Sequence, residues 1–211
     1  MGTMIDLLGS LIFGGALMMI ILSAHDTARE NQSVYCNDMI VQQSLTGVVR
    51  MVEGELRNMG SGCLSGDTVI VLVADSNKFS FRADLNHDGI PDTITYWTGP
   101  TTELLETQNE MDRKLYRHFG SGAGGNSVTD VVALVTQFHL DYENKYKDPM
   151  GPTPIPSNQL RLVNVVVVTV EVQSPFAPYR QKGTVQTGQR DAWYSSSLWQ
   201  QTRLVSQNLN R

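Results

Sequence analysis

The sequence has little of several features that define protein classes. Cysteine is scarce, with two residues among 211 and no CxxC pair, which excludes a zinc cluster or a disulfide scaffold. Basic residues do not dominate, since 16 lysines and arginines stand against 21 aspartates and glutamates, for a net charge of -5. Because the basic residues are also scattered, we expect no nucleic-acid partner. The chain contains no GxSxG, HExxH or P-loop pattern, so we expect no enzymatic activity.

The two cysteines, Cys36 and Cys63, are not expected to pair within one chain. A helix from Cys36 to Asn58 would be about 33 Å long at a rise of about 1.5 Å per residue. The five residues from Asn58 to Cys63 can return only about 17 Å at full extension. Two free thiols are therefore expected, and a disulfide bond to another chain stays open.

One long uncharged run is present, LLGSLIFGGALMMIILSA, from Leu7 to Ala24. Its eighteen residues are at the lower limit for a helix that crosses a bilayer core of about 30 Å. A secretory signal peptide also has an apolar run, but basic residues precede that run, whereas Asp6 precedes this one. We expect residues 1–24 to form an apolar membrane or filament-core segment of a longer helix.

The next segment, residues 25–60, predicts an amphipathic continuation of the same helix. Its apolar residues recur at steps of three and four, which places them on one side of a helix; they are Val41, Leu45, Val48, Val49, Val52, Leu56 and Met59. The remaining faces are expected to carry Arg50, Glu53, Glu55, Arg57 and Asn58. Glycines at positions 60 and 62 then supply a stop signal. The pattern predicts one helix over roughly residues 5–59.

Small residues interrupt the apolar run, at Gly9, Ser10, Gly14, Gly15 and Ala16. In an apolar medium, small residues let two helices approach closely. We therefore expect Gly14 and Gly15 to take part in assembly with other helices. The alternative is a flexible or kinked membrane anchor.

Residues 61–211 predict a β-rich globular head, because the pattern changes to the alternation typical of strands. The strands are expected at 68–74, 78–83, 93–97, 137–142, 160–172 and 192–209, while 103–117 fits either a short helix or a loop and a strand. Consecutive strands with short connections favour an antiparallel sheet, with the striped helix covering one face. The expected fold class is therefore α+β, a long N-terminal helix packed on an antiparallel sheet.

The segment DLNHDGIPD has the spacing of a calcium-binding loop. Oxygen-bearing side chains occupy its positions 1, 3, 5 and 9, a glycine is at position 6, and a main-chain carbonyl can add a ligand at position 7; the candidate ligands are Asp84, Asn86, Asp88, Ile90 and Asp92. The glutamate that such loops carry at position 12 is replaced by Thr95. A plain hairpin turn is the alternative, since Asp, Asn and Gly all favour turns.

Several stretches of the sequence are similar to segments of a known protein family. They are ELRNMGSGC at the helix end, FSFRADLNHDGIPDTITYW and VTQFHLDYEN in the head, VNVVVVTVEVQS, and WQQTRLVSQNL near the end. Together with the layout of helix and sheet, these stretches resemble the type IV pilins and, more closely, the larger minor pseudopilins and minor pilins. The resemblance covers nearly the whole chain and contains no single highly specific motif.

The resemblance implies a structural subunit of a type IV pilus-like or pseudopilus filament, assembled from the membrane by bundling of N-terminal helices. Its implied partners are copies of itself, other pilin-like subunits, the inner-membrane assembly machinery and membrane lipid before assembly. The implied location is the inner membrane of a prokaryote, crossed once, and then an extracellular or periplasmic filament.

The first residues depart from the family pattern. The family has a basic leader, a glycine at the cleavage point and a glutamate at the fifth position of the mature chain. A mature chain that began at Gly2 would have Asp6 at its fifth position, and removal of an initiator methionine would give the same start. If Gly2 were instead the glycine at the cleavage point, Asp6 would be the fourth residue of the mature chain. A carboxylate at the edge of an apolar helix needs a partner, and the amine of a neighbouring subunit is one. The alternative is a solvated carboxylate at the membrane surface.

A second function class fits the same sequence. A single apolar helix and a folded head also describe a binding or adhesion module that is anchored in a membrane by one span and never polymerises, with or without calcium in the loop at 84–92.

Overall fold

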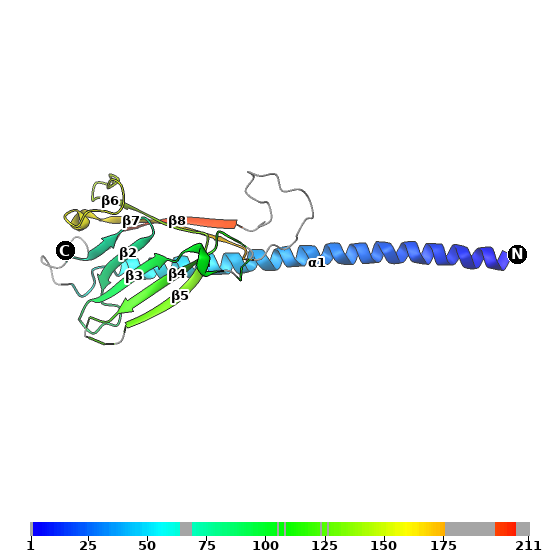
Figure 1. The fold of residues 1–211 in the computed structure, drawn as a ribbon, viewed down its shortest axis with the longest axis horizontal. Helices are drawn as coiled ribbons and strands as arrows, with labels where there is room; N and C mark the ends of the chain where they lie inside the picture. The colour runs from blue at the N-terminus through cyan, green and yellow to red at the C-terminus, as the bar shows by residue number, and fades with distance from the viewer. Residues whose placement is uncertain are drawn as a thin grey trace.

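The computed structural model describes residues 2–63, 69–104, 106–107, 109–122, 124–125, 127–175 and 197–205. A long helix, α1, extends far beyond a head of β-strands (Figure 1). Helix α1 spans Gly2–Arg57, and a turn follows it up to Gly62. The prediction of one helix through both the apolar and the amphipathic segment is confirmed, and the helix passes from the first segment to the second without a break.

The described part of the head contains two antiparallel sheets, one with strand order β1-β2-β3-β4-β5 and one with order β6-β7-β8. Two short 3-10 turns, η1 and η2, lie between strands. The bounds are β1 Val71–Ala74, β2 Lys78–Ala83, β3 Asp92–Thr98, η1 Thr101–Glu103, β4 Arg113–Gly120, β5 Ser127–Val135, β6 Gln137–Glu143, η2 Leu160–Leu162, β7 Val165–Gln173 and β8 Ser197–Val205.

The α+β prediction is confirmed, with the difference that the strands divide between two sheets. The division falls at Thr136, between β5 and β6, where the chain leaves the first sheet and enters the second. The backbone N–H of Thr136 donates to the carbonyl of Glu171 in β7 over 2.9 Å. This bond joins the end of the first sheet to a strand of the second.

Helix α1 packs against both sheets through the predicted apolar stripe. Each residue of the stripe is buried, with at most 7% of its surface exposed: they are Val41, Leu45, Val48, Val49, Val52, Leu56 and Met59. Burial of one such side chain stabilises a fold by about 1.5–3 kcal/mol relative to exposure. The stripe therefore holds the second half of α1 firmly to the head.

The strand predictions are confirmed most closely where side chains alternate. Strand β2 has the predicted bounds, and β3 and β6 extend the predicted ranges by one or two residues. In β6 the predicted apolar face, Phe138, Leu140 and Tyr142, is buried. Strands β1 and β8 lie inside the predicted ranges, and the other residues of 68–74 and 192–209 either lie outside strands or outside the described residues.

Two predictions were wrong in detail. The predicted strand over 160–172 begins as the turn η2, because Leu160 and Val163 are buried at a spacing of three while Leu162 is exposed. Strand β5 was not expected, because its first five residues are all exposed and show no alternation. It lies at the edge of its sheet, where only one neighbour constrains it. The ambiguous stretch 103–117 ends in β4, which supports the loop-and-strand alternative.

Candidate functional site: the exposed helix and its joint with the head

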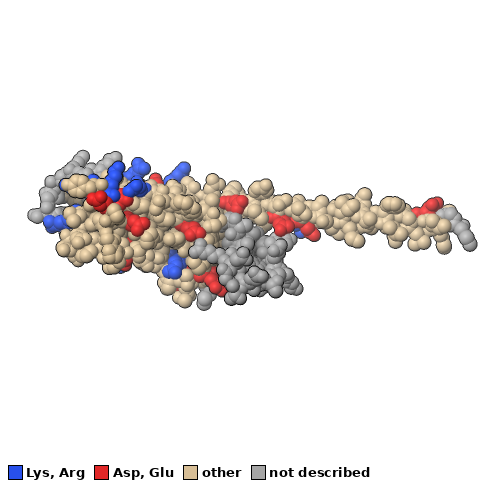
Figure 2. Space-filling model, turned by 90° about the horizontal axis from the view of Figure 1, so that it is seen from above, with Lys and Arg blue, Asp and Glu red and all other residues tan. Residues whose placement is uncertain are grey.

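The apolar rod, which we define as residues 3–24 of α1, contacts nothing else in the described chain. Its large apolar side chains are between 54% and 80% exposed, from Leu22 to Phe13. Among the described residues it belongs to the one helix that is long and apolar enough to cross a membrane. Figure 2 shows the same feature: on the visible face, a long stretch of the helix without charge follows an acidic patch near the N-terminal end. The rod is therefore a candidate membrane span.

Two hydroxyl groups of the rod region form hydrogen bonds within the helix itself. The hydroxyl of Ser10 donates to the carbonyl of Leu7 over 2.9 Å, and that of Thr27, just beyond the rod, donates to Ser23 over 3.0 Å. Such bonds satisfy hydroxyl groups inside the helix itself. Asp6 differs, because its side chain is exposed at one end of the rod.

No contact within the described chain requires glycine at the glycine positions of the rod. A Cβ atom added at Gly9, Gly14 or Gly15 would meet nothing within 4 Å. Gly2, the fourth predicted assembly residue besides Asp6, Gly14 and Gly15, lies in the first turn of α1. Gly14 and Gly15 therefore leave space on the surface of the helix, where another molecule can approach closely.

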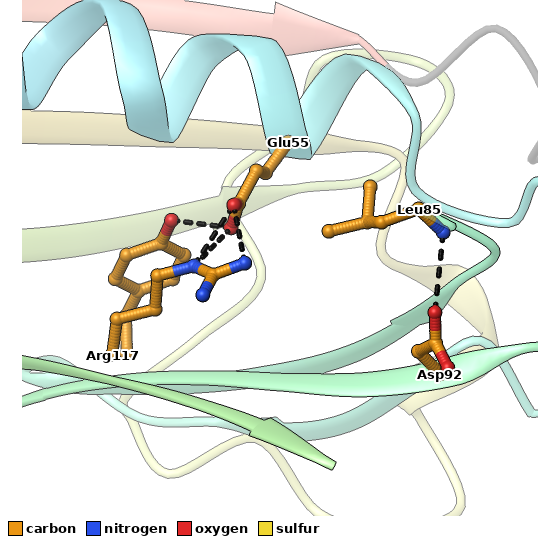
Figure 3. Close-up of polar contacts among 5 residues, drawn as sticks. Glu55, Leu85, Asp92 and Arg117 are labelled. Carbon is orange, nitrogen blue, oxygen red and sulfur yellow. Dashed lines mark hydrogen bonds and ion pairs between the residues drawn. The ribbon is translucent and has the colours of Figure 1, made fainter. Parts of the chain in front are cut away.

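A polar cluster joins α1 to the first sheet. Arg117 of β4 donates from Nε to both carboxylate oxygens of Glu55, over 2.8 and 3.1 Å, and its Nη2 lies 2.7 Å from Oε1 (Figure 3). Tyr96 of β3 donates its hydroxyl to Oε2 of Glu55 over 2.5 Å. Glu55 was expected on a face of the helix outside the apolar stripe, and its side chain is only 15% exposed. Its spacing from Val52 and Met59 places it on the flank of the buried stripe.

Within this cluster the pKa values of Tyr96 and Arg117 are both raised, which favours the protonated form of each side chain. Burial raises the pKa of Tyr96, and the neighbouring charge of Glu55 raises it further. Burial alone would lower the pKa of Arg117, but its hydrogen bond to Glu55 and the charge of that carboxylate outweigh burial and raise it. Tyr96 therefore stays a hydrogen-bond donor, and Arg117 stays charged.

The loop between β2 and β3 holds the predicted calcium ligands, and its side chains are bonded to the loop itself. The carboxylate of Asp84 accepts from the N–H groups of Asp88 and Gly89 over 3.2 and 3.0 Å. The side-chain oxygen of Asn86 accepts from the N–H of Asp88 over 3.1 Å, and Oδ1 of Asp88 accepts from the N–H of Ile90 over 2.8 Å. These are the hydrogen bonds of a tight turn.

Asp92, the last predicted ligand, is buried at the start of β3. It accepts from the N–H of Leu85 over 3.3 Å (Figure 3) and from the N–H of Gly122 over 3.1 Å. No group of three or more His, Cys, Asp or Glu side chains in the described ranges is placed to hold a metal ion. Calcium binding by this loop stays a prediction.

Both cysteines are free, as expected; Cys36 is exposed on α1 and Cys63 is half-buried. Burial raises the pKa of the Cys63 thiol, and the positive charge of Arg82 opposes that shift. Among the described histidines, His118 contacts the hydroxyl of a threonine, His139 a carboxylate of an aspartate and His87 a main-chain oxygen. The prediction that the chain is not an enzyme stays a prediction.

The loop between β3 and β4 carries a buried carboxyl that sequence reasoning did not single out. Asp112 is 2% exposed, and burial raises its pKa to about 6 although a hydrogen bond from Thr107 lowers it. In the same loop, Asn109 donates from Nδ2 to Oε1 of Gln173 over 3.1 Å. The loop therefore ties the first sheet to the end of β7.

A groove of about 510 Å³ lies where the rod side of the head meets α1. Ile40, Gly47 and Met51 of the helix form one wall, Val132 of β5 is on the other, and Val172 of β7 also lines it. None of its described lining residues is charged.

No protein-family model matches the sequence. No curated protein matches it at a significant level.

Proposed function

We propose that the chain is a structural subunit of a type IV pilus-like or pseudopilus filament. One observation carries this proposal: a rod that is apolar on all sides and exposed in the isolated chain continues, as one helix, into a segment clamped to a folded head. The rod needs an apolar environment, and lipid or like helices supply one. Bundling of rods would bury them and place the heads outside.

The joint between helix and head supports a mechanical role. The apolar stripe and the Glu55–Arg117–Tyr96 cluster hold the second half of α1 against both sheets. A head fixed in this way moves with its rod as one body. The position of each rod in a bundle would then determine the position of each head.

The resemblance to minor pseudopilins and minor pilins gives the proposal its partners and place. The partners are other copies of the chain or other pilin-like subunits, together with the assembly machinery of a prokaryotic inner membrane. Before assembly the rod would lie in that membrane, and afterwards in an extracellular or periplasmic filament. Asp6 would set the register by pairing with the N-terminal amine of a neighbouring subunit.

The proposal is tested with a size series at Gly14, in cells that produce the chain. Gly14→Ala and Gly14→Leu both fit the isolated chain, since an added Cβ atom meets nothing within 4 Å. Both favour helix formation by up to about 1 kcal/mol, so a loss of assembly that grows with side-chain size would reflect contact between helices. Gly54→Leu, at an exposed position in the clamped half of α1, is the matched control.

Sheared surface material is examined by electron microscopy with an antibody against the head. We expect labelled filaments from the wild type and from the Gly54→Leu variant, and at least tenfold fewer from Gly14→Leu at equal amounts of total chain. If wild-type cells retain all of the chain in the membrane as monomers, the anchored binding module is the better description.

A further inference from the structure

The outer face of the second sheet carries an exposed tryptophan. Trp199 of β8 is 68% exposed, although tryptophan is a largely buried residue on average. In the same strand, Leu204 lines a small cavity together with Val52 of α1, so its side chain faces the helix. Because side chains alternate along a strand, Trp199 faces the other way, toward solvent.

The neighbours of Trp199 on this face are polar. Residues that are paired directly across neighbouring strands share a face. Trp199 is paired with Glu171 of β7, and Glu171 is paired with Gln137 of β6. Two residues further along β8, Gln201 is paired with Thr169. Neighbouring strands lie about 4.8 Å apart, and alternate residues of a strand roughly 6.7 Å apart. These polar groups are therefore within reach of a small molecule stacked on the indole ring.

Two of the polar side chains are held in place by their neighbours. Oε1 of Glu171 accepts from the hydroxyl of Ser197 and from Nε2 of Gln173, each over 2.9 Å. Nε2 of Gln201 donates to the hydroxyl oxygen of Thr169 over 3.2 Å. A carboxylate and an amide that are already oriented lose less side-chain entropy when they bind a ligand.

This combination of groups suits a sugar ring better than a protein surface. The core of a protein interface is apolar and depleted of charged residues, whereas the ring of Trp199 is bordered by a carboxylate and amides. A pyranose with equatorial hydroxyls has a small flat C–H face, which can stack on an indole ring. It also has a rim of hydroxyls, which can form hydrogen bonds with carboxylates and amides.

The charges of the second sheet indicate an uncharged ligand. The basic side chains of its three strands are His139 and Arg203, and they lie against the carboxylates of Asp141 and Glu143. Glu171 adds a negative charge beside Trp199. An anionic polymer such as a nucleic acid is bound through cations that neutralise its phosphates. The face around Trp199 therefore does not suit such a polymer.

We propose that the face around Trp199 binds an uncharged glycan whose pyranose rings have equatorial hydroxyls, as the rings of cellulose and chitin do. One ring stacks on the indole of Trp199, and its hydroxyls form hydrogen bonds with Glu171 and Gln201. This proposal does not rest on the filament proposal, because the head of a single chain has the same face.

Calorimetric titration of cellohexaose and of chitohexaose into the full chain tests the site, in a detergent without a sugar headgroup. We expect saturable binding of at least one of the two by the wild type. Trp199→Ala should weaken it at least tenfold, and Trp199→Phe, which keeps an aromatic ring, should weaken it less. Gln201→Leu, which removes the amide at similar size, should weaken it several-fold. Tyr146→Ala is the matched control, since Tyr146 is another aromatic residue, 72% exposed, and it should change binding less than twofold.

Three outcomes overturn the proposal. One is the absence of binding of both oligosaccharides by a wild-type chain whose circular dichroism shows it to be folded. Another is an equal loss in Tyr146→Ala and Trp199→Ala, which indicates general adsorption to exposed aromatic rings. The third is sugar binding that Trp199→Ala leaves unchanged; if the same variant has a lower mass in light scattering, the face is a contact between copies of the chain.

Discussion

At the residue scale, Glu55 shows how a charged side chain can hold an apolar joint together. It lies on the flank of the buried stripe of α1, and its two carboxylate oxygens receive Arg117 and Tyr96 from two neighbouring strands. Both side chains of the ion pair are mostly buried, 15% exposed for Glu55 and 20% for Arg117. Removal of one partner leaves the other charge without compensation, which is much worse than loss of a surface pair.

The first prediction concerns this pair. Arg117→Ala should lower the free energy of unfolding by about 3 kcal/mol, because it leaves the carboxylate of Glu55 buried and unpaired. Arg57→Ala is the matched control, since Arg57 is 64% exposed and lies 4.0 Å from Glu53; it should change stability by less than about 0.5 kcal/mol. Urea unfolding of the full chain in detergent measures both. Equal effects of the two substitutions would show that the cluster does not hold the joint.

The second prediction concerns the half-buried thiol. Because burial raises the pKa of Cys63, less of it is thiolate at a given pH, and alkylation by iodoacetamide should be slower than for a free thiol. In a Cys36→Ser background, the pH midpoint of the rate should lie above that of N-acetylcysteine, and unfolding in urea should lower it. Arg82→Gln should raise it further, since the charge of Arg82 opposes the shift. A folded-state midpoint at or below that of the free thiol would contradict this account.

At the element scale, the end of α1 is fixed by its connection to β2. The N–H of Gly60 donates to the carbonyl of Arg82 over 2.8 Å, and the N–H of Asp84 donates to the carbonyl of Ser61 over 3.0 Å. Gly62 follows with a φ of +71°, and a Cβ atom there would lie 2.6 Å from Cβ of Asp84. Both the backbone conformation and the space require glycine at this position.

Gly62→Ala should therefore destabilise the head by about 1–3 kcal/mol, through strain and the displacement of Asp84. Gly54→Ala is the control, because Gly54 lies in the helix with nothing within 4 Å of an added Cβ atom. It should stabilise the chain by about 0.5–1 kcal/mol. Thermal unfolding in detergent distinguishes the two, and a Gly62→Ala variant as stable as the wild type would remove the role assigned to the turn.

The sequence predicted best those helices and strands whose buried residues recur at a regular interval along the chain. The stripe of α1 is visible at steps of three and four, and all seven of its residues are buried. The faces of β2 and β6 are visible as alternation for the same reason. Strand β5 has no such signal, since its first five residues are exposed and its order comes from pairing with β4.

The polar contacts of the head could not be predicted in this way. Arg117 and Tyr96 are 62 and 41 residues from Glu55, and the sequence carries no sign that strands β3 and β4 lie beneath that turn of the helix. The one available signal was the spacing of Glu55 from the apolar stripe, which places its side chain on the flank of the buried face. The burial of Asp112 likewise has no signal in the sequence.

At the scale of the whole molecule, the head and the apolar rod differ in how they treat apolar side chains. The head buries its own apolar residues between α1 and two sheets, whereas the apolar rod leaves its large side chains exposed. The head and the rod share one unbroken helix (Figure 1). The rod is a candidate membrane span, and in the filament proposal other rods cover it.

Electron cryomicroscopy of the sheared surface filaments tests this central claim most directly. The account predicts a filament core built from packed α1 helices, with Gly14 and Gly15 at the contacts between rods and the heads on the outside. It would be contradicted if the chain occurs only as separate molecules whose rods are surrounded by lipid.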